Sequence, residues 1–226
     1  MTKRFFTSDQ HIRHSFVSAL RLEALLEAGH QGHHPYPRPV TRENMTDAMA
    51  EEVARIQAEK WDAVVGPEDT VFVLGDIAIN PKRDRAFEWF RERPGKKHLI
   101  AGNHDEVHPM HSKALQAQQD WNWHGTFATI NSWARLKIEG RTVLMSHFPY
   151  NGEGSRTIPD RNVEYRLRDN GFPLLHGHTH ALHKAHTSAL GSPMFHVGVD
   201  AWELGLVPES TIVEWLDYLP PQPQGT

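Results

Sequence analysis

Five short polar motifs, rich in histidine and aspartate, stand out in the chain. In order they are Asp9-Gln10-His11, Gly75-Asp76, Gly102-Asn103-His104-Asp105, Ser146-His147 and Gly177-His178-Thr179-His180. Imidazole, carboxylate and amide groups are ligands for divalent transition metals. Two such ions, ~3.5–4 Å apart, can activate water and stabilise a phosphate during its hydrolysis. Each motif alone is common by chance, and a single histidine is usually solvated or hydrogen-bonded, so only the ordered set indicates this chemistry.

The composition narrows the kind of site and the kind of protein. Of 226 residues, 17 are histidine and none is cysteine. A transition-metal site must therefore use imidazole and oxygen ligands, while disulfides and cysteine nucleophiles are excluded. No apolar run is long enough for a signal peptide or a membrane span, so we expect a cytoplasmic protein with no membrane partner. The net charge of -4 argues against a protein that coats nucleic acid.

The elements that must position the motifs are short apolar strands. The predicted strands are Arg4–Ser8, Thr70–Leu74, Lys97–Ala101, Ala134–Ile138, Thr142–Ser146, Pro173–His176 and Met194–Gly198. The predicted helices are Thr41–Val64 with Thr41 as N-cap, Pro81–Arg91, Ser112–Gln119 and Glu209–Tyr218. Continuous apolar runs are typical of strands buried on both faces. We predict an α/β sandwich of two mixed sheets flanked by helices, parallel early in the chain and antiparallel later.

The motifs follow the predicted strands, and this placement explains how they can meet. Ligands bind beyond the carboxyl ends of strands in open α/β sheets. In an extended segment, residues two apart point the same way, so Asp9 and His11 can reach one ion. The same geometry places His178 and His180 on one side. The glycines within three motifs allow sharp turns and a close approach to the metals. Residues 1–218 are expected to form a single domain, and the proline-rich residues 219–226 a disordered tail.

The order of the motifs resembles the calcineurin-like metallophosphoesterase superfamily, over residues 4 to 204. The resemblance extends to a small bacterial and phage branch through Asp9–His14, Arg38-Pro39, Asp69–Asp76, Leu144–Pro149 and His196–Asp200. It implies a four-layer sandwich and a binuclear hydrolase. It implies a first ion on Asp9, His11 and His180, a second ion on Asn103, His147 and His178, and Asp76 as the bridge. It implies Mn²⁺ as the first expectation for both ions, with iron, zinc, nickel or cobalt as alternatives.

The resemblance also implies roles in the reaction. A hydroxide bridging the two ions would attack phosphorus, and His104, beside the metals, would protonate the leaving oxygen as general acid. Asp105 would orient the His104 ring. The alternative roles are a third ligand or a structural loop residue for His104, and a helix N-cap for Asp105.

The sequence after Asp76 bears on the substrate. Protein serine/threonine phosphatases of this superfamily carry Gly-Asp-x-x-Asp-Arg, whereas this chain has Gly75-Asp76-Ile77-Ala78-Ile79-Asn80. The missing arginine favours small phosphodiesters, such as cyclic nucleotides, over phosphomonoesters. His14 and Arg156 are candidate substrate-binding residues, although His14 can equally pack beneath the site. Segment 152–170 also holds Arg161, Arg166 and Arg168, and is either a lid that meets phosphate or a solvated loop and helix.

Other functions use the same features. A nuclease or a phosphomonoesterase would use the same metal site with a different substrate. A scaffold that has lost its metals would be a non-enzymatic interaction module, but every ligand position here holds a suitable residue type. A metallo-β-lactamase-like hydrolase would need a His-x-His-x-Asp-His block, which is absent. We therefore expect a small phosphoester as partner and no stable nucleic-acid complex, while monomer and homodimer both stay open.

Overall fold

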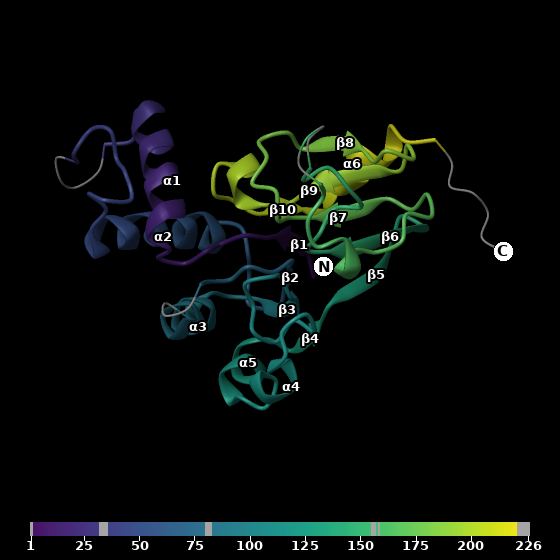
Figure 1. Cartoon of the computed structure of the whole chain (residues 1–226), viewed down its shortest axis with the longest axis horizontal. Coiled ribbons are helices and arrows are strands. Elements are labelled where there is room, and N and C mark those ends of the chain that lie inside the picture. The colour runs from purple at the N-terminus through teal and green to yellow at the C-terminus, as the bar shows by residue number, and fades with distance from the viewer. Residues whose placement is uncertain (1, 32–35, 80–82, 155–156, 158, 221–226) are drawn as a thin grey trace.

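Two five-stranded sheets pack face to face in a computed structural model that describes residues 2–31, 36–79, 83–154, 157 and 159–220 (Figure 1). The strands are β1 (Arg4–Thr7), β2 (Thr70–Val73), β3 (Lys96–Ile100), β4 (Thr129–Asn131), β5 (Trp133–Ile138), β6 (Arg141–Ser146), β7 (Leu174–His176), β8 (Ala185–Thr187), β9 (Pro193–His196) and β10 (Val207–Pro208). The helices are α1 (Ser15–Glu27), α2 (Asp47–Asp62), α3 (Arg83–Glu92), α4 (Ala114–Ala117), α5 (Trp121–Thr126) and α6 (Glu209–Asp217), with short 3-10 helices η1 (Val163–Tyr165) and η2 (Val199–Trp202).

The first sheet has the order β10-β1-β2-β3-β4 and the second has the order β5-β6-β7-β9-β8. β1 to β4 are parallel, and β10 is antiparallel to β1. In the second sheet β6, β7 and β9 are parallel, while β5 and β8 pair antiparallel at the edges. An isolated parallel bridge between Ser8 and Gly198 joins the two sheets beside the ends of β1 and β9.

Strand β1 of the first sheet is buried on both faces, and the alternation of its side chains explains why. Phe5 points into the core between this sheet and the helices α2, α3 and α5, which also contains Trp61 and Phe90. Phe6, the next residue, points into the core between the two sheets, where it meets residues such as Met145. Because both faces are apolar, the strands read as continuous apolar runs rather than alternating ones.

The helices lie mainly on the outer side of the first sheet (Figure 1). α1 and α2 pack on each other through a separate apolar cluster that includes Leu22 and Val53. α6 packs beside β10 and β1, and the Trp215 ring contacts Phe195 of β9 at a tilt, with ring centroids 4.8 Å apart. On the second sheet, Leu174 and Met194 are covered by Tyr150 rather than by a helix. The predicted α/β sandwich of two mixed sheets with helices is confirmed.

Several local predictions were wrong. The helix predicted to begin at Thr41 begins at Asp47, because the Thr46 side chain accepts from Met49 N (3.2 Å) and caps it. Thr41 N instead donates to the side chain of Asn44 (2.8 Å) in a turn. The later strands are not simply antiparallel, since β6, β7 and β9 run parallel. The sequence interpretation also missed α1, α5, β4, β8 and β10.

At the C-terminal end, Arg141 donates to the carbonyl oxygens of Leu219 (3.2 Å) and Pro220 (3.3 Å). The rest of the predicted disordered tail, residues 221–226, lies outside the described residues. Among the described residues, no helix is long and apolar enough to cross a membrane.

Candidate metal centre

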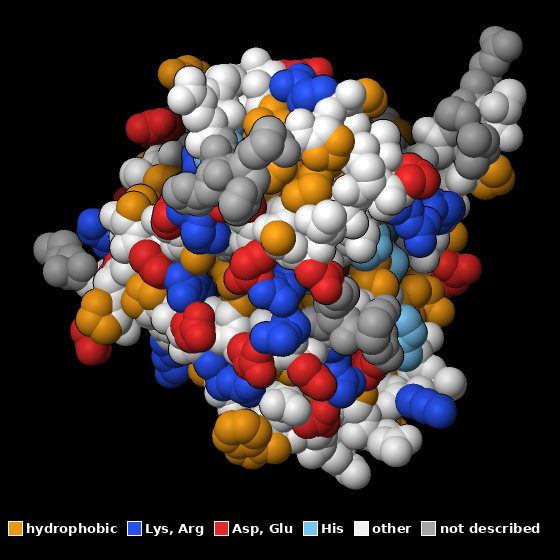
Figure 2. Space-filling view, turned by 90° about the vertical axis from the view of Figure 1, so that its left-hand side faces the viewer, with side chains coloured by type: hydrophobic (Ala, Val, Ile, Leu, Met, Phe, Trp, Pro, Cys, Tyr) orange, Lys and Arg blue, Asp and Glu red, His pale blue; other side chains and the backbone are white. Residues whose placement is uncertain are grey.

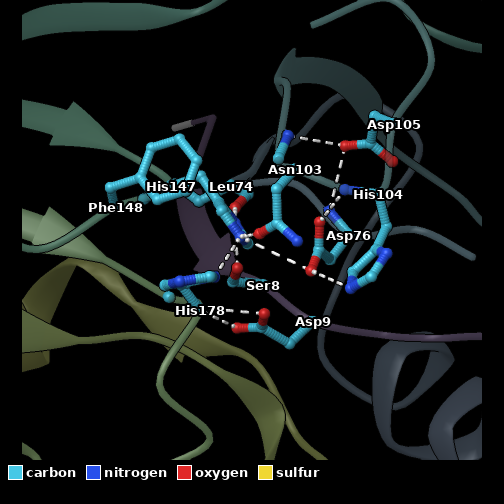
Figure 3. Close-up of polar contacts among 12 residues, drawn as sticks. Ser8, Asp9, Leu74, Asp76, Asn103, His104, Asp105, His147, Phe148 and His178 are labelled. Carbon is cyan, nitrogen blue, oxygen red and sulfur yellow. Dashed lines mark hydrogen bonds and ion pairs between the residues drawn. The ribbon is translucent and has the colours of Figure 1, made fainter. Parts of the chain in front are cut away.

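The predicted polar motifs meet where loops from both sheets come together (Figure 3). The loops after β1, β2 and β3 come from the first sheet, and those after β6 and β7 from the second. The loop residues brought together are Asp9, His11, Asp76, Asn103, His104, His147, His178 and His180. Each loop follows the carboxyl end of its strand, as the strand-end rule predicts.

The backbone aims these side chains through turns rather than through extended segments. Asp9, His11, Asp76, His178 and His180 have φ between 45° and 71°, in the left-handed region. The extended-segment argument for Asp9 with His11, and for His178 with His180, was therefore wrong. Such a φ costs about 1–3 kcal/mol for a residue other than glycine and persists only where neighbours enforce it. Hydrogen bonds from Asp9 N to Gly75 O (2.9 Å) and from His11 N to Asp76 O (3.0 Å) hold the loop after β1 in place.

Two glycines allow the loops to approach closely, as predicted. A Cβ atom on Gly102 would lie 2.3 Å from Asp76 Oδ1. A Cβ atom on Gly177 would lie 2.0 Å from Ser8 Oγ and 2.5 Å from Asp9 Oδ2. A side chain at either position would push a carboxylate of the centre out of place.

The first group of ligand atoms belongs to Asp9, His11 and His180, whose donor atoms lie within 4.8 Å of one another. His180 Nε2 lies 3.2 Å from His11 Nε2. Asp9 is fully buried, and its carboxylate accepts from His178 N (3.0 and 3.1 Å). Burial lowers the pKa of His11 well below its usual value, so this ring is neutral and offers a lone pair.

The second group belongs to Asp76, His147 and His178, with Asn103 beside it. His147 Nδ1 donates to Leu74 O (2.7 Å), so His147 Nε2 faces the centre. There His147 Nε2 lies 3.0 Å from Asn103 Oδ1 and 3.2 Å from His178 Nδ1. Burial, together with the neighbouring His147, lowers the pKa of His178 to about 3, so this ring is also neutral.

Asp76 lies between the two groups. Its Oδ2 is 3.5 Å from His11 Nε2 of the first group and 3.5 Å from His147 Nε2 of the second. Burial disfavours the carboxylate, but the His147, His11 and His104 rings lower the pKa of Asp76 below its usual range. One carboxylate oxygen equidistant from both groups is suited to bridging two cations.

The donor set fits bound cations. His147 Nδ1 and the outer nitrogen of His178 each have a partner of their own, so in the neutral rings the inward nitrogens carry lone pairs. In that neutral state, which a metal ligand requires, these two nitrogens, Asn103 Oδ1 and Asp76 Oδ2 are all acceptors that point at one another, and in the metal-free protein a proton on His147 stands in for the cation. Only a proton or a cation can satisfy them, and imidazole with oxygen ligands suits a divalent transition metal.

Comparison with known proteins agrees with this geometry. The family model for calcineurin-like phosphoesterases matches residues 6–182, which contain every motif described above. The chain belongs to the calcineurin-like phosphoesterase family. The predicted resemblance is confirmed, and membership implies a metal-dependent phosphoester hydrolase.

Phage proteins are among the relatives of this phosphoesterase. It is 36% identical over 213 residues to the Gene 66 protein of Mycobacterium phage L5. The matched region covers 89% of this chain and 88% of the phage protein. It is 43% identical over 169 residues to the Gene 66 protein of Mycobacterium phage D29, covering 71% and 81%. A crystal structure of a protein of unknown function, AQ665 from Aquifex aeolicus, superimposes with a TM-score of 0.60 over 95% of this chain and 100% of that one. At 20% identity, that structure shows a shared fold alone.

The phosphoesterase places His104 at the edge of the centre. The ring is 41% exposed, and its Nε2 lies 3.9 Å from Asp76 Oδ2. Its backbone N–H donates to Asp76 Oδ1 (2.9 Å). The ring packs edge-on against His11, with ring centroids 5.5 Å apart. His104 is therefore near both groups and still open to solvent.

The structure records partners for Asp105 other than the predicted His104 ring. Both of its carboxylate oxygens accept backbone N–H groups, from Gly102 (2.7 Å), Asp76 (2.9 Å) and Ile77 (3.1 Å). Burial and the nearby Asp76 raise the pKa of Asp105, while the N–H groups of Gly102 and Ile77 and the neighbouring His147 oppose the shift. These three contacts join the loops after β2 and β3, so in this structure Asp105 orients the Asp76 loop.

Arg21 and Asp200 support the first group, and the sequence interpretation gave neither a role. Asp200 accepts from His180 Nδ1 (2.7 Å) and from the Arg21 guanidinium (2.7 and 2.9 Å). Arg21 also donates to the carbonyl oxygens of Asp9 (2.6 Å) and Gln10 (2.7 Å). Two signals were available: an arginine inside the apolar run of α1, and an aspartate just after a predicted strand.

Of the two predicted substrate-binding residues, the structure describes only His14. His14 lies beside His11, with ring centroids 5.9 Å apart, and its Nδ1 accepts from Val17 N (3.4 Å) to cap α1. Burial lowers the pKa of His14. Arg156 lies outside the described residues. Within the same loop Arg166 is buried in ion pairs, so the loop is not simply solvated.

Proposed function

We propose that this chain is a binuclear metal-dependent phosphodiesterase that hydrolyses small phosphodiesters such as cyclic nucleotides. The observation that carries the proposal is the inward-facing set of acceptors, which lies on both sides of one carboxylate oxygen of Asp76. Two cations there would match the ligand sets expected from the sequence, with Asp76 as the shared ligand.

The chain's own residues would prepare the site for an in-line attack. Asp9, His11 and His180 would hold one cation, and Asn103, His147 and His178 the other. When bound, the pair supplies an acidified water as nucleophile and neutralises the phosphate oxygens. Asp105 holds the Asp76 loop through two backbone N–H groups, so the shared ligand keeps its place. Such preorganised groups stabilise developing charge without rearrangement.

His104 is the proposed general acid. Its Nε2 is 3.9 Å from the shared carboxylate, while almost half of the ring remains open to solvent and substrate. An alkoxide is a poor leaving group and needs a proton as the bond to phosphorus breaks. A ring beside the ligands, rather than among them, can deliver that proton.

The preference for diesters follows from the residues after Asp76. The Asp and Arg positions of the phosphatase motif hold Ile79 and Asn80 here, so the arginine that assists phosphomonoester binding in protein phosphatases is missing. Arg85, the nearest arginine of an Asp-Arg pair, is exposed and ion-paired with Glu88 on α3 (3.6 Å). A diester carries one negative charge fewer than a monoester dianion and needs less cationic support.

A nuclease is the main alternative. Proteins that bind nucleic acid strongly present a basic surface to the phosphate backbone. On the side of the molecule where α1 and α2 lie, positive and negative side chains of the described residues are interspersed (Figure 2). That face therefore offers no broad basic track, and we favour a small substrate.

We further propose that residues 1–218 act as one domain in the cytoplasm. Each ligand group combines residues from loops of both sheets, so neither sheet alone contains a centre. The lack of cysteine fits a reducing compartment.

The proposal is tested by a substrate screen on protein loaded with Mn²⁺, with iron, zinc, nickel and cobalt in parallel. The panel contains a cyclic nucleotide, bis-p-nitrophenyl phosphate, p-nitrophenyl phosphate and plasmid DNA. We expect the diesters to have the highest kcat/KM. A preference for p-nitrophenyl phosphate would indicate a phosphomonoesterase, and salt-sensitive cleavage of plasmid would indicate a nuclease. Protein that binds no added metal and hydrolyses nothing would indicate a scaffold.

A further inference from the structure

The loop between β6 and β7 returns an acidic side chain to the centre. Glu153 lies six residues after His147 in the sequence, and its carboxylate contacts Nε2 of His178. The Glu153 side chain is only 3% exposed, although it belongs to a loop. A buried carboxylate on a loop requires partners that compensate for the loss of water.

The contact determines which nitrogen of His178 faces inward. His178 Nδ1 lies 3.2 Å from His147 Nε2, in the second ligand group. Because the carboxylate of Glu153 can only accept, the proton of the neutral ring sits on Nε2 and the lone pair on Nδ1. Carboxylates that hold the outer nitrogen of a ligand histidine in this way orient the ring and make it a better ligand.

Arg166 in turn holds Glu153. The Arg166 guanidinium, 4% exposed, pairs with Glu153 and Asp160 and donates to Arg161 O (2.6 Å). Asp160 accepts from Gly152 N (3.1 Å) on the other side of the same loop. These contacts close the loop on itself and leave the Glu153 carboxylate in one position.

A role in stability alone does not explain this arrangement well. Buried ion pairs add little net stability, because desolvation offsets most of the attraction, but they can fix one geometry. This one fixes a carboxylate on the nitrogen of a predicted metal ligand. Arg161, 73% exposed, also reaches Glu153 Oε1 (3.3 Å), so solvent touches the rim of the network but not its centre.

We propose that Glu153, held by Arg166, is a positioning residue that turns His178 Nδ1 toward the second cation and so sets the affinity of that site. This inference rests on the two-cation centre proposed above. It assigns Glu153 no contact with substrate. The first cation does not depend on this loop, because His180 is held by Asp200.

The test measures metal binding rather than turnover. Wild type, Glu153→Ala and Glu153→Gln are titrated with Mn²⁺ by calorimetry, and the bound Mn²⁺ is followed by electron paramagnetic resonance. We expect Glu153→Ala to weaken one of two sites about 10–100-fold and leave the other unchanged. At intermediate Mn²⁺ the spectrum should change from that of a coupled pair to that of an isolated ion. Glu153→Gln, which keeps an acceptor for Nε2–H, should fall between wild type and Glu153→Ala.

Two controls separate positioning from folding. Glu164→Gln changes an exposed acid of the same loop and should bind both ions as wild type does. Arg166→Lys keeps the charge but cannot span Glu153 and Asp160, so it should weaken the same single site. The melting temperature of each metal-free variant shows whether it is folded; if Glu153→Ala is not, Glu153→Gln and Arg166→Lys decide.

The outcomes distinguish this inference from the proposed function. Wild type that binds fewer than two ions would overturn the two-cation centre and this inference with it. Wild type that binds two ions, with unchanged affinities in folded Glu153 variants, would overturn the positioning role alone. Equal weakening of both sites would also contradict it, since the first group has its own support.

Discussion

The two halves of the candidate metal centre have similar donor residues but are supported in different ways. In the first half, His180 is held by Asp200, which pairs with Arg21 from helix α1. In the second half, His178 is held by Glu153 from the loop between β6 and β7. Regular elements packed in the core support the first half, whereas a loop closed by its own ion pairs supports the second. Loops open more readily than packed helices, so the second half is the one whose affinity a small change can adjust.

Asp76 is shared by both halves, so changing it should affect both and produces the largest expected effect. Asp76→Asn removes the charge of the oxygen that lies 3.5 Å from each half. We expect affinity for both ions to fall by more than ~100-fold, beyond the range typical of a residue that only orients a ligand, and turnover to fall to background. Metal analysis and diester hydrolysis measure this, with exposed Asp84→Asn as control. Loss of one ion alone would mean that Asp76 belongs to one half.

His104 belongs to neither half, and its replacement should separate chemistry from metal binding. We expect His104→Ala to keep both ions and to lose about 100- to 10,000-fold in kcat on alkyl diesters. The loss should shrink for substrates with p-nitrophenolate, which leaves without a proton. Unchanged kcat in a metal-replete sample would exclude His104 as the acid, and loss of an ion would make it a ligand.

Asp200→Asn tests the support of the first half. It removes the carboxylate on His180 and leaves Arg21 buried without its charged partner. We expect about 10–100-fold weaker binding of one ion. We also expect the metal-free protein to lose about 3–5 kcal/mol of its free energy of unfolding. Calorimetry measures the metal affinity and urea unfolding measures the free energy of unfolding. In Glu153→Ala, by contrast, the site that Asp200→Asn leaves unchanged should weaken. If the two variants affect the same site, the division into halves is wrong.

The smallest expected effect is the release of a proton from His147 when the cation of the second half binds. Burial opposes a charge on His147, but Asp76 and the Leu74 carbonyl raise the pKa of His147 in the metal-free protein to about 10. At pH 7 a proton therefore occupies the nitrogen that faces the second cation, and binding must release it. Affinity for that ion should rise by at most about tenfold per pH unit between pH 7 and pH 9. Calorimetry in buffers of different ionisation enthalpy counts the protons, and no release would contradict this state of His147.

The raised pKa of His147 also predicts how the free energy of unfolding of the metal-free protein depends on pH. Because the folded pKa of His147 lies above the ordinary value of 6.5, its contribution to the free energy of unfolding is full below pH 6.5. It is lost as the pH rises toward 10. Metal-free wild type should therefore unfold at lower urea concentration at pH 9 than at pH 6, and this pH dependence should be smaller in a His147→Gln variant.

The sequence predicted which polar residues meet better than it predicted what supports them. Strand-end placement singled out Asp9, Asp76 and His147 because histidine and aspartate after an apolar run form a local pattern. The left-handed turns at those positions are set by tertiary contacts, so the extended geometry expected from the sequence was wrong. Asp105 looked like the partner of its neighbour His104, but folding gives its oxygens to backbone groups of the β2 and β3 loops.

The residues that were missed lie far in sequence from the side chains that they contact. Arg21 precedes Asp200 by 179 residues, and Glu153 precedes His178 by 25. No local pattern links such partners, since only the tertiary fold brings them together. Helix α1 was missed because exposed Phe16 and Leu20 blur its amphipathic pattern, although its residues are good helix formers.

The arrangement of loops at the seam between the sheets has a consequence for the lifetime of the folded chain. Asp9 and His11 come from one sheet and His180 from the other, and the second group is divided in the same way. A cation that binds both sides acts as a removable cross-link between them. At a free metal concentration about 100 times the Kd, it would add ~2.7 kcal/mol to the free energy of unfolding. The supply of metal would then govern how long this protein survives proteolysis, as well as how fast it works.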